Sequence, residues 1–406
     1  MAELYLKGLS KIEAGLIEAM ENMDIIDGHE HVPPEKTRTS MDVDLFTLFA
    51  HYNKGDLMRA GMSLELFESL FDRKIPLETR WQSFKPHWDN VRHTSYSRAA
   101  LIAARKFYGA KDINEKNYRY VSERIKKFNR PGLYKKVFKD ACRIRTCLNQ
   151  CGRTDLDPSF FTPVMPLRGG MGDIRTNPSI KNLEDYTAAV EKNILKVKKE
   201  GAVGLKMRAM PYSTPDRKKA SLEFAKIRQG KQTSVSAFEN YTVDRAIAFA
   251  GRHNLTIAVH TGYWGDFRNL HPLHMIPLLQ KYSGVRFDIY HLGYPWVRDT
   301  LMLAKGFSNV WLNLCWTYII SQKCATEALD EAVDTVPSNK VIGFGGDYNK
   351  PVENIYGHLV MARESIAKVL GGRIKEGTMT EKEALAIIKK WLWDNPVELY
   401  GLDMKK

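Results

Sequence analysis

Long apolar runs are missing from this sequence of 406 residues, although 44% of its residues are hydrophobic. No segment approaches the roughly 20 consecutive apolar residues that a membrane-spanning helix needs. Residues 1–23 carry acidic side chains throughout and lack the uninterrupted apolar core of a signal peptide. These absences predict a soluble, cytoplasmic protein with no membrane partner.

Cysteine is scarce, with five residues in the whole sequence. Cys142, Cys147 and Cys151 lie close together, but their spacing matches neither a zinc ribbon nor a CxxC redox pair. We therefore expect free, mostly buried thiols, which fit a reducing compartment.

A concentrated basic tract is also absent, although 61 Lys and Arg residues against 47 Asp and Glu residues give a net charge of +14. The basic residues are dispersed and are not interleaved with aromatics in the manner of a nucleic-acid-binding module. The excess charge favours a small, anionic substrate, because a positive field draws anions inward. We expect no nucleic-acid partner, and a homo-oligomer stays open.

What the sequence does contain is a regular series of short, β-rich runs. Eight runs are predicted to be strands: residues 23–32, 142–150, 160–167, 201–209, 255–262, 285–293, 309–316 and 339–347. Stretches with helical period separate the later runs, and this alternation indicates βαβ units and a parallel sheet. Eight strands favour an α/β fold of the (β/α)₈ TIM-barrel type, with an open doubly wound sheet as the alternative.

One interval breaks this alternation. Between the first and second predicted strands, residues 38–140 read mostly as helix, so we expect a large helical insertion after strand 1 within a single barrel domain, 1–406. Loops that follow strands lie at the carboxyl face of a barrel, where active sites are built. A shorter insertion, residues 210–234, follows strand 4 and could form part of a lid.

Polar residues fall repeatedly where the apolar runs end. The residues in such positions are His29, His31, Lys206, His260, His291 and Asp347. Any one of them alone would be read as a hydrogen-bonded structural residue, a salt-bridge partner or a turn. Together, at the same end of five strands, they favour a metal site.

The first strand shows how such a site could be assembled. Residues i and i+2 of a strand point to the same side, so His29 and His31 can share one cation. Neutral imidazole suits zinc, and a catalytic zinc site keeps an open position for water or substrate. Asp347 adds a carboxylate, which can bind the metal and exchange a proton with its water.

These motifs resemble the amidohydrolase superfamily, in particular its amidohydrolase 2 branch. The resemblance rests on the D-x-H-x-H of residues 27–31, "VGLKMR", "VHTG", "YHLG" and "GGDY", followed by "WLWDNPVELYGL" near the end. It covers nearly the whole sequence. Each motif is short, and the ordered set carries the likeness.

The resemblance implies a ligand set. By it, His29, His31, His260 and Asp347 bind a divalent metal, most often Zn²⁺, with Mn²⁺ as the alternative. His291 then either binds a second metal or orients and polarises the substrate. Lys206 matches a lysine that is carbamylated to bridge two metals in binuclear members. We expect one metal, and Lys206 would then contact the substrate.

The helical insertion also resembles that of uronate isomerases, which belong to the same superfamily. Those enzymes lack a counterpart of His291 and carry T-D-S-R where this sequence has "GGDYNK". The differences favour a metal-dependent hydrolase of a C–N or C–O bond. An aldose–ketose isomerase of an acidic sugar and a nonoxidative decarboxylase are the alternatives.

In a hydrolase, Asp347 would act as general base and then general acid, while His291 would stabilise the oxyanion. An anionic substrate needs fixed donors, and the arginine fork suits a carboxylate. The candidates for substrate binding are Arg208, which shares a strand face with Lys206, then Arg145, Arg168, Trp264, Tyr52 and Arg92.

Overall fold

The computed structural model describes residues 8–231 and 233–404, so the first seven residues of the N-terminal stretch considered above lie outside it. Eight strands form one sheet in chain order. They are β1 (Ile25–Glu30), β2 (Ile144–Asn149), β3 (Phe161–Pro166), β4 (Gly204–Arg208), β5 (Thr256–His260), β6 (Phe287–Tyr290), β7 (Val310–Asn313) and β8 (Val341–Ile342). The segment after β8 runs beside β1, where the Gly28 N–H donates to the Phe344 carbonyl at 3.0 Å. The fold is the nearly closed parallel (β/α) barrel that the sequence predicts.

The chain divides into two compact units, and each is described by itself. The first runs to Cys147 and adds residues 315–331 and 343–389, and the second comprises the remaining segments. The first unit contains α1 (Lys11–Glu21), α2 (Glu35–Thr39), α3 (Asn53–Arg59), α4 (Leu64–Ser69), α5 (Leu77–Val91), α6 (Ser95–Tyr108), α7 (Tyr118–Phe128), α13 (Thr317–Ile320), most of α14 (Gln322–Thr335), α15 (Asn354–Lys375) and α16 (Glu381–Lys389). The second contains α8 (Leu183–Lys199), α9 (Arg217–Arg228), α10 (Ser236–Arg252), α11 (Ile276–Lys281), α12 (Val297–Gly306) and α17 (Asn395–Tyr400).

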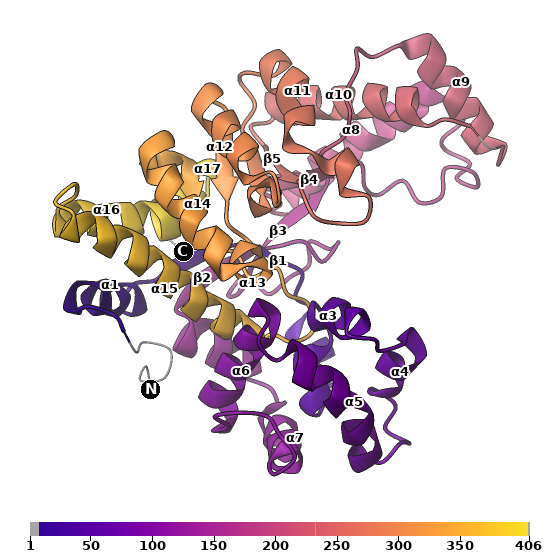
Figure 1. Cartoon of the computed structure of the whole chain (residues 1–406). Coiled ribbons are helices and arrows are strands. Elements are labelled where there is room, and N and C mark those ends of the chain that lie inside the picture. The colour runs from indigo at the N-terminus through magenta and orange to yellow at the C-terminus, as the bar shows by residue number, and fades with distance from the viewer. Residues whose placement is uncertain (1–7, 232, 405–406) are drawn as a thin grey trace. The chain divides into compact units, whose positions relative to one another are not determined.

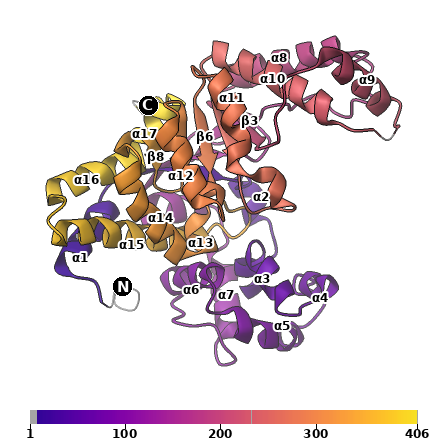
Figure 2. The same cartoon turned by 45° about the horizontal axis from the view of Figure 1, so that its top comes forward.

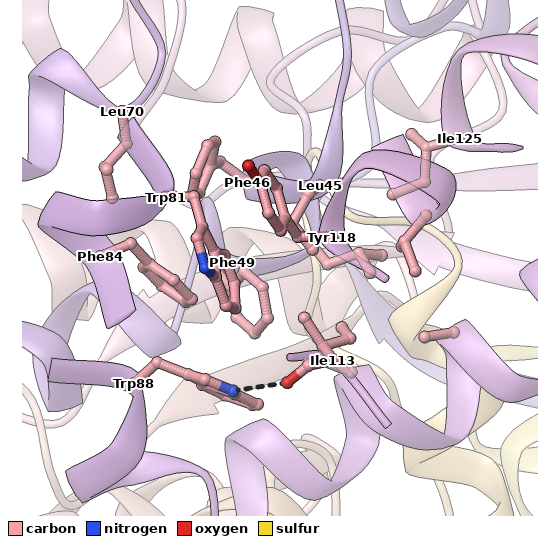
Figure 3. Packing of buried hydrophobic residues seen from close by; sticks show 14 of the residues in the cluster. Leu45, Phe46, Phe49, Leu70, Trp81, Phe84, Trp88, Ile113, Tyr118 and Ile125 are labelled. Carbon is pink, nitrogen blue, oxygen red and sulfur yellow. Dashed lines mark hydrogen bonds between the residues drawn. The ribbon is translucent and has the colours of Figure 1, made fainter. Parts of the chain in front are cut away.

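Helices α3 to α7 of the first unit lie together (Figures 1 and 2), and their buried side chains form an apolar core. In α5, Trp81, Phe84 and Trp88 recur at helical spacing and are at most 1% exposed. Trp81 stacks on Tyr118, and the Trp88 indole N–H donates to the Ile113 carbonyl at 3.1 Å (Figure 3). Burial of such large rings stabilises this region strongly.

The helical region is fixed to the helix that follows β8. Gly357 in α15 lies so close to α6 that an added Cβ would overlap the Ala99 carbonyl. Arg98 of α6 also forms an ion pair with Glu364 of α15 at 2.9 Å. The helices after β1 are thereby held against the segment that carries Asp347.

In the second unit, the register of the parallel strands brings their carboxyl ends level. Arg208 of β4 lies opposite His260 of β5, which lies opposite Tyr290 of β6, which lies opposite Asn313 of β7. The polar residues that end these strands are therefore close neighbours, as expected for parallel strands of similar length.

The cysteines and the helices agree with the sequence-based expectations. All five cysteines are free, and Cys142, Cys147 and Cys315 are buried. Burial raises the pKa of Cys142 to about 12, which keeps this thiol protonated. Across residues 8–231 and 233–404, no helix combines the length and the apolar character that crossing a membrane requires.

Candidate metal centre and substrate pocket

Two imidazoles and one carboxylate converge at the end of β1. The Nε2 atoms of His29 and His31 lie 3.0 and 3.4 Å from the same Oδ1 atom of Asp347. His29 and Asp347 are buried, whereas the side chain of His31 is 41% exposed. The D-x-H-x-H motif therefore places both histidines toward the aspartate that the sequence assigned to the same site.

The loop after β8 holds Asp347 in an uncommon backbone conformation. Its φ angle is +61°, and its N–H donates to the His29 carbonyl at 2.8 Å. Gly346 precedes it because any Cβ at that position would overlap the Glu30 carboxyl group. Strained backbone of this kind is concentrated at functional sites.

A buried carboxyl pair lies in the same strand as the histidines. Asp27 Oδ1 accepts hydrogen bonds from the N–H groups of His29 and Gly346, both at 3.1 Å. Glu30 Oε2 accepts from the Tyr348 N–H at 2.7 Å. Burial raises the pKa of Asp27 to about 6, and burial together with the charge of Asp27 raises the pKa of Glu30 well above its usual value. The hydrogen bonds from Gly346 and Tyr348 to this pair tie β1 to the loop that carries Asp347.

A stack of aromatic rings brings the Tyr52 hydroxyl group to Asp347. Tyr52 stacks between Tyr96 and Trp316, with ring centroids 5.1 and 5.0 Å away. Its hydroxyl group donates to Asp347, and burial together with that carboxylate raises the pKa of Tyr52 well above its usual value. Tyr52 was predicted from the sequence as a pocket residue, and the structure brings it to the carboxylate.

His51 is a site neighbour that the sequence reasoning missed. Its ring lies 4.0 Å from that of Tyr52 and 6.0 Å from that of Tyr348, centroid to centroid. Burial lowers the pKa of His51 to about 4, so the imidazole is neutral at physiological pH and can accept a proton. A sequence signal was present, because the pair "HY" follows the buried segment Leu45–Phe49 after one intervening residue, Ala50.

The second unit contains the other two candidate histidines, His260 and His291. His291 Nε2 lies 3.0 Å from His260 Nδ1, so one imidazole N–H is donated to the other ring. His291, Leu292 and Gly293 all have positive φ angles, and the Thr261 hydroxyl donates to the Tyr290 carbonyl at 2.7 Å. The loops after β5 and β6 are therefore fixed together, and they hold the two rings in contact.

Lys206 lies above a buried polar network. Its Nζ atom is 3.8 Å from the centre of the Tyr290 ring, which favours a cation. The Tyr290 hydroxyl is 3.3 Å from that of Tyr400, which donates to Asp288 Oδ2 at 2.7 Å. Asn313 donates to the same Asp288 oxygen at 3.0 Å. Burial raises the pKa of Asp288 to about 7 despite these two hydrogen bonds.

A cavity of about 500 Å³ opens at the ends of β3 and β4. Its cationic lining residues are Arg168, Lys206 and Arg208, and Glu239 of α10 and Asn269 also line it. Arg168 donates to the Thr242 hydroxyl at 2.8 Å and lies 3.5 Å from Glu239. Three of the residues predicted to bind an anionic substrate thus share one cavity of the second unit.

The remaining predicted residues lie elsewhere. Arg145 is half-buried on β2 in the first unit, and Arg92 forms an ion pair with Asp112 in the helical region. Trp264 is 48% exposed in the loop after β5, with its ring 6.5 Å from that of His260. Arg92 is thus engaged within its own subdomain, whereas Trp264 stays beside a candidate ligand.

A family comparison bears on this arrangement of strand ends. The sequence model of the family described as amidohydrolase matches residues 182–402, which is more than half of the chain. The chain belongs to the amidohydrolase family. The match includes the candidate residues of this amidohydrolase on β4, β5, β6 and after β8, whereas the histidines of β1 lie before the matched range.

Solved structures resemble this amidohydrolase over nearly its whole length. The uronate isomerase of Thermotoga maritima superposes with a TM-score of 0.80 at 15% identity, covering 97% of this chain and 98% of that one. Glucuronate isomerase from Caulobacter crescentus gives 0.78 at 15% identity, covering 97% and 95%. A protein from Lactobacillus casei described as a metal-dependent hydrolase gives 0.67 at 16% identity, covering 95% and 97%. At these identities the likeness establishes the fold alone.

A curated relative matches part of the amidohydrolase sequence. Protein fluG of Emericella nidulans is 27% identical over 154 residues, which are 37% of this chain. The match spans only 18% of that protein, so the chain corresponds to less than a fifth of its relative's length.

Proposed function

We propose that this amidohydrolase is a metal-dependent hydrolase that cleaves a C–N or C–O bond of a small anionic substrate. The observation that carries the proposal is the convergence of His29 Nε2 and His31 Nε2 on one oxygen of Asp347. Imidazole and carboxylate donors grouped in this way suit zinc, and manganese is the alternative.

The donor chemistry of the residues fits one divalent cation. His29, His31 and Asp347 would hold it, with His260 as the fourth ligand proposed from the family resemblance. When bound, such a metal acidifies water and polarises the scissile carbonyl group. Lys206, above the Tyr290 ring, would then contact the substrate rather than bridge two metals.

Side chains of the protein would carry out the proton transfers. Asp347 would take a proton from water as general base and return it to the leaving group as general acid. The Tyr52 hydroxyl, which donates to Asp347, would keep that carboxylate oriented. His291 would donate a hydrogen bond to the developing oxyanion.

Isomerisation of an acidic sugar is a second candidate, favoured by a specific observation. Tyr52 and the neutral His51 lie beside Asp347, and their ring centroids are 4.0 Å apart. An aldose–ketose interconversion moves one proton between carbons and another between oxygens. A carboxylate with a second proton acceptor nearby could serve both transfers. Decarboxylation, the third reaction considered from the sequence, is favoured by no contact described above.

The first experiment measures bound metal in the purified protein by elemental analysis. We expect about one zinc per chain, falling to near zero in a His29→Ala/His31→Ala variant. A His271→Ala/His274→Ala variant is the matched control, because this second histidine pair has ring centroids 5.9 Å apart and holds no carboxylate in common. Retention of the metal in the first variant, or its loss in the control, would contradict the proposal.

Isotope labelling then separates the two reactions on a panel of anionic amides, esters, lactones and uronates. Hydrolysis in ¹⁸O-labelled water places one labelled oxygen in the product. Isomerisation in D₂O places deuterium on carbon and requires no oxygen from water. A product that carries deuterium without ¹⁸O would replace hydrolysis by the second candidate.

A further inference from the structure

We propose that the cavity at the ends of β3 and β4 binds a ligand group with two negative charges, and that Glu239 competes with this group for Arg168. The inference deepens the proposed function by naming the substrate class. The claim that the bound group belongs to a substrate rests on the proposed function, whereas the claim that the cavity binds a dianion does not. The group would be a phosphate monoester or a closely spaced pair of carboxylates.

The charges that line the cavity support a dianion. Arg168, Lys206 and Arg208 supply three positive charges, and Glu239 supplies one negative charge. A ligand with a single carboxylate would leave the cavity positive, whereas a dianion would balance it. Arginine forks bind phosphate or carboxylate through paired N–H donors, so two of these three cations also supply geometric specificity.

The backbone fixes where these cations stand. Pro166 of β3 pairs with Lys206 of β4, so the chain just beyond β3 passes beside the end of β4. Lys206 and Arg208 are two residues apart on one strand and share a face. Arg208 is paired with His260, which places the cationic cavity at the strand ends that also carry a candidate metal ligand.

Arg168 has a competing partner within the cavity. Its guanidinium group lies 3.5 Å from a Glu239 oxygen and donates to the Thr242 hydroxyl at 2.8 Å. The Glu239 side chain is 41% exposed, so its pairing with Arg168 is weak and can be exchanged. A dianion entering the cavity would replace the Glu239 carboxylate as the partner of Arg168.

This competition predicts opposite effects for two substitutions in one cavity. Calorimetric titration of the full-length protein with inorganic phosphate, at a pH where it is a dianion, should show saturable binding. Because each lost charge-assisted contact is worth roughly a tenfold change in affinity, Arg208→Leu should weaken binding by about tenfold. Glu239→Gln should strengthen it by about threefold to tenfold, since it removes the competing charge.

Matched controls separate a built cavity from a generally basic surface. Glu191→Gln frees Arg245 from an ion pair of 3.3 Å on the neighbouring helices without touching the cavity. Arg217→Leu removes an exposed cation that pairs with Glu184. Both controls should stay within about twofold of the parent, because exposed pairs outside the cavity contribute little. Arg208→Lys, which keeps the charge, should recover part of the affinity.

Further measurements distinguish the sources of the dianion and the dependence on metal. Succinate, malonate and acetate are titrated beside phosphate, and the tighter of the dianions identifies the ligand class. All titrations are repeated after removal of metal by a chelator. The inference would be overturned if Arg217→Leu and Arg208→Leu lost equal affinity for phosphate, or if Glu239→Gln gained none. Binding that required only the metal would also overturn it. If the protein purifies without metal and still binds phosphate in an Arg208-dependent manner, the inference is upheld although the proposed function fails.

Discussion

The two units bring different chemistry to the ends of their strands. In the first unit, His29 and His31 face Asp347, and the carboxyl groups of Asp27 and Glu30 lie buried in the same strand. In the second, two imidazoles contact each other and three cations line a cavity with a single acidic residue. The first group is suited to hold a cation, and the second is suited to hold an anion.

On the proposed function, the first unit supplies three of the four metal ligands, and the second supplies the cations that would recognise the substrate. Buried carboxylates lower the free energy of a bound cation, and burial raises the pKa of Asp27 to about 6. Cations around an open cavity instead repel a metal and attract a substrate. Substitutions in each unit should therefore affect different measurable properties.

The largest effect is expected from Asp347→Asn in the first unit. The substitution keeps the shape of the side chain but removes the base, so the rate should fall by about 10²- to 10⁴-fold. The affinity for phosphate in the second unit should be unchanged. Steady-state kinetics on the substrate identified by the panel, together with calorimetry, measure both quantities. A variant that keeps its rate would remove Asp347 from the proton chemistry.

A smaller effect, on stability, is expected from Gly346→Ala. The new methyl group would overlap the Glu30 carboxyl group, at a cost of about 2–4 kcal/mol in the free energy of unfolding. Gly372→Ala is the control, because nothing stands near that position in α15 and alanine should stabilise the helix by about 0.5–1 kcal/mol. Denaturant unfolding measures both. Equal stabilities for the two variants would show that the loop after β8 relaxes freely.

The second unit has its own aspartate-to-asparagine test, Asp288→Asn. Because the pKa of Asp288 is raised to about 7 when folded, the stability it contributes is present at acidic pH and is lost as pH rises from about 4 through 7. The variant should lack that part of the pH dependence, on the order of 4 kcal/mol, and keep its metal. Thermal unfolding of the parent and the variant across this pH range measures the difference in stability. An unchanged pH profile would mean that Asp288 ionises normally.

The positions of the strand-end residues could be predicted because they depend on local periodicity. Each apolar run marks a strand, and the residue that ends the run must lie at the carboxyl face of a parallel barrel. This reasoning located His29, His260, His291 and Asp347 in their loops or strand ends. It overestimated β8, which has only two residues because the glycine-rich segment after Ile342 leaves regular strand pairing.

The contributions of the helical region could not be predicted in the same way. The charge of Asp347 acts on His51, which lies between Phe49 and α3, and nothing in the local spacing of residues predicts that proximity. Helix α5 lies within the predicted helical insertion, residues 38–140, and it continues through Pro86. The pairing of Arg168 with Glu239 is likewise a tertiary contact with no signature in spacing.

The contact of Tyr400 with Asp288 has a consequence for the order in which the protein forms. Tyr400 occupies the space that Gly204 leaves open, where an added Cβ would lie 2.8 Å from its ring, and it supplies a hydrogen bond to the buried carboxyl group 112 residues earlier. During synthesis, β4, β5 and β6 emerge long before residue 400. Their interior therefore stays incomplete until α17 arrives, and this unit finishes folding only after a long-range closure. Until α17 arrives, the Asp288 carboxyl group lacks the hydrogen bond that Tyr400 supplies.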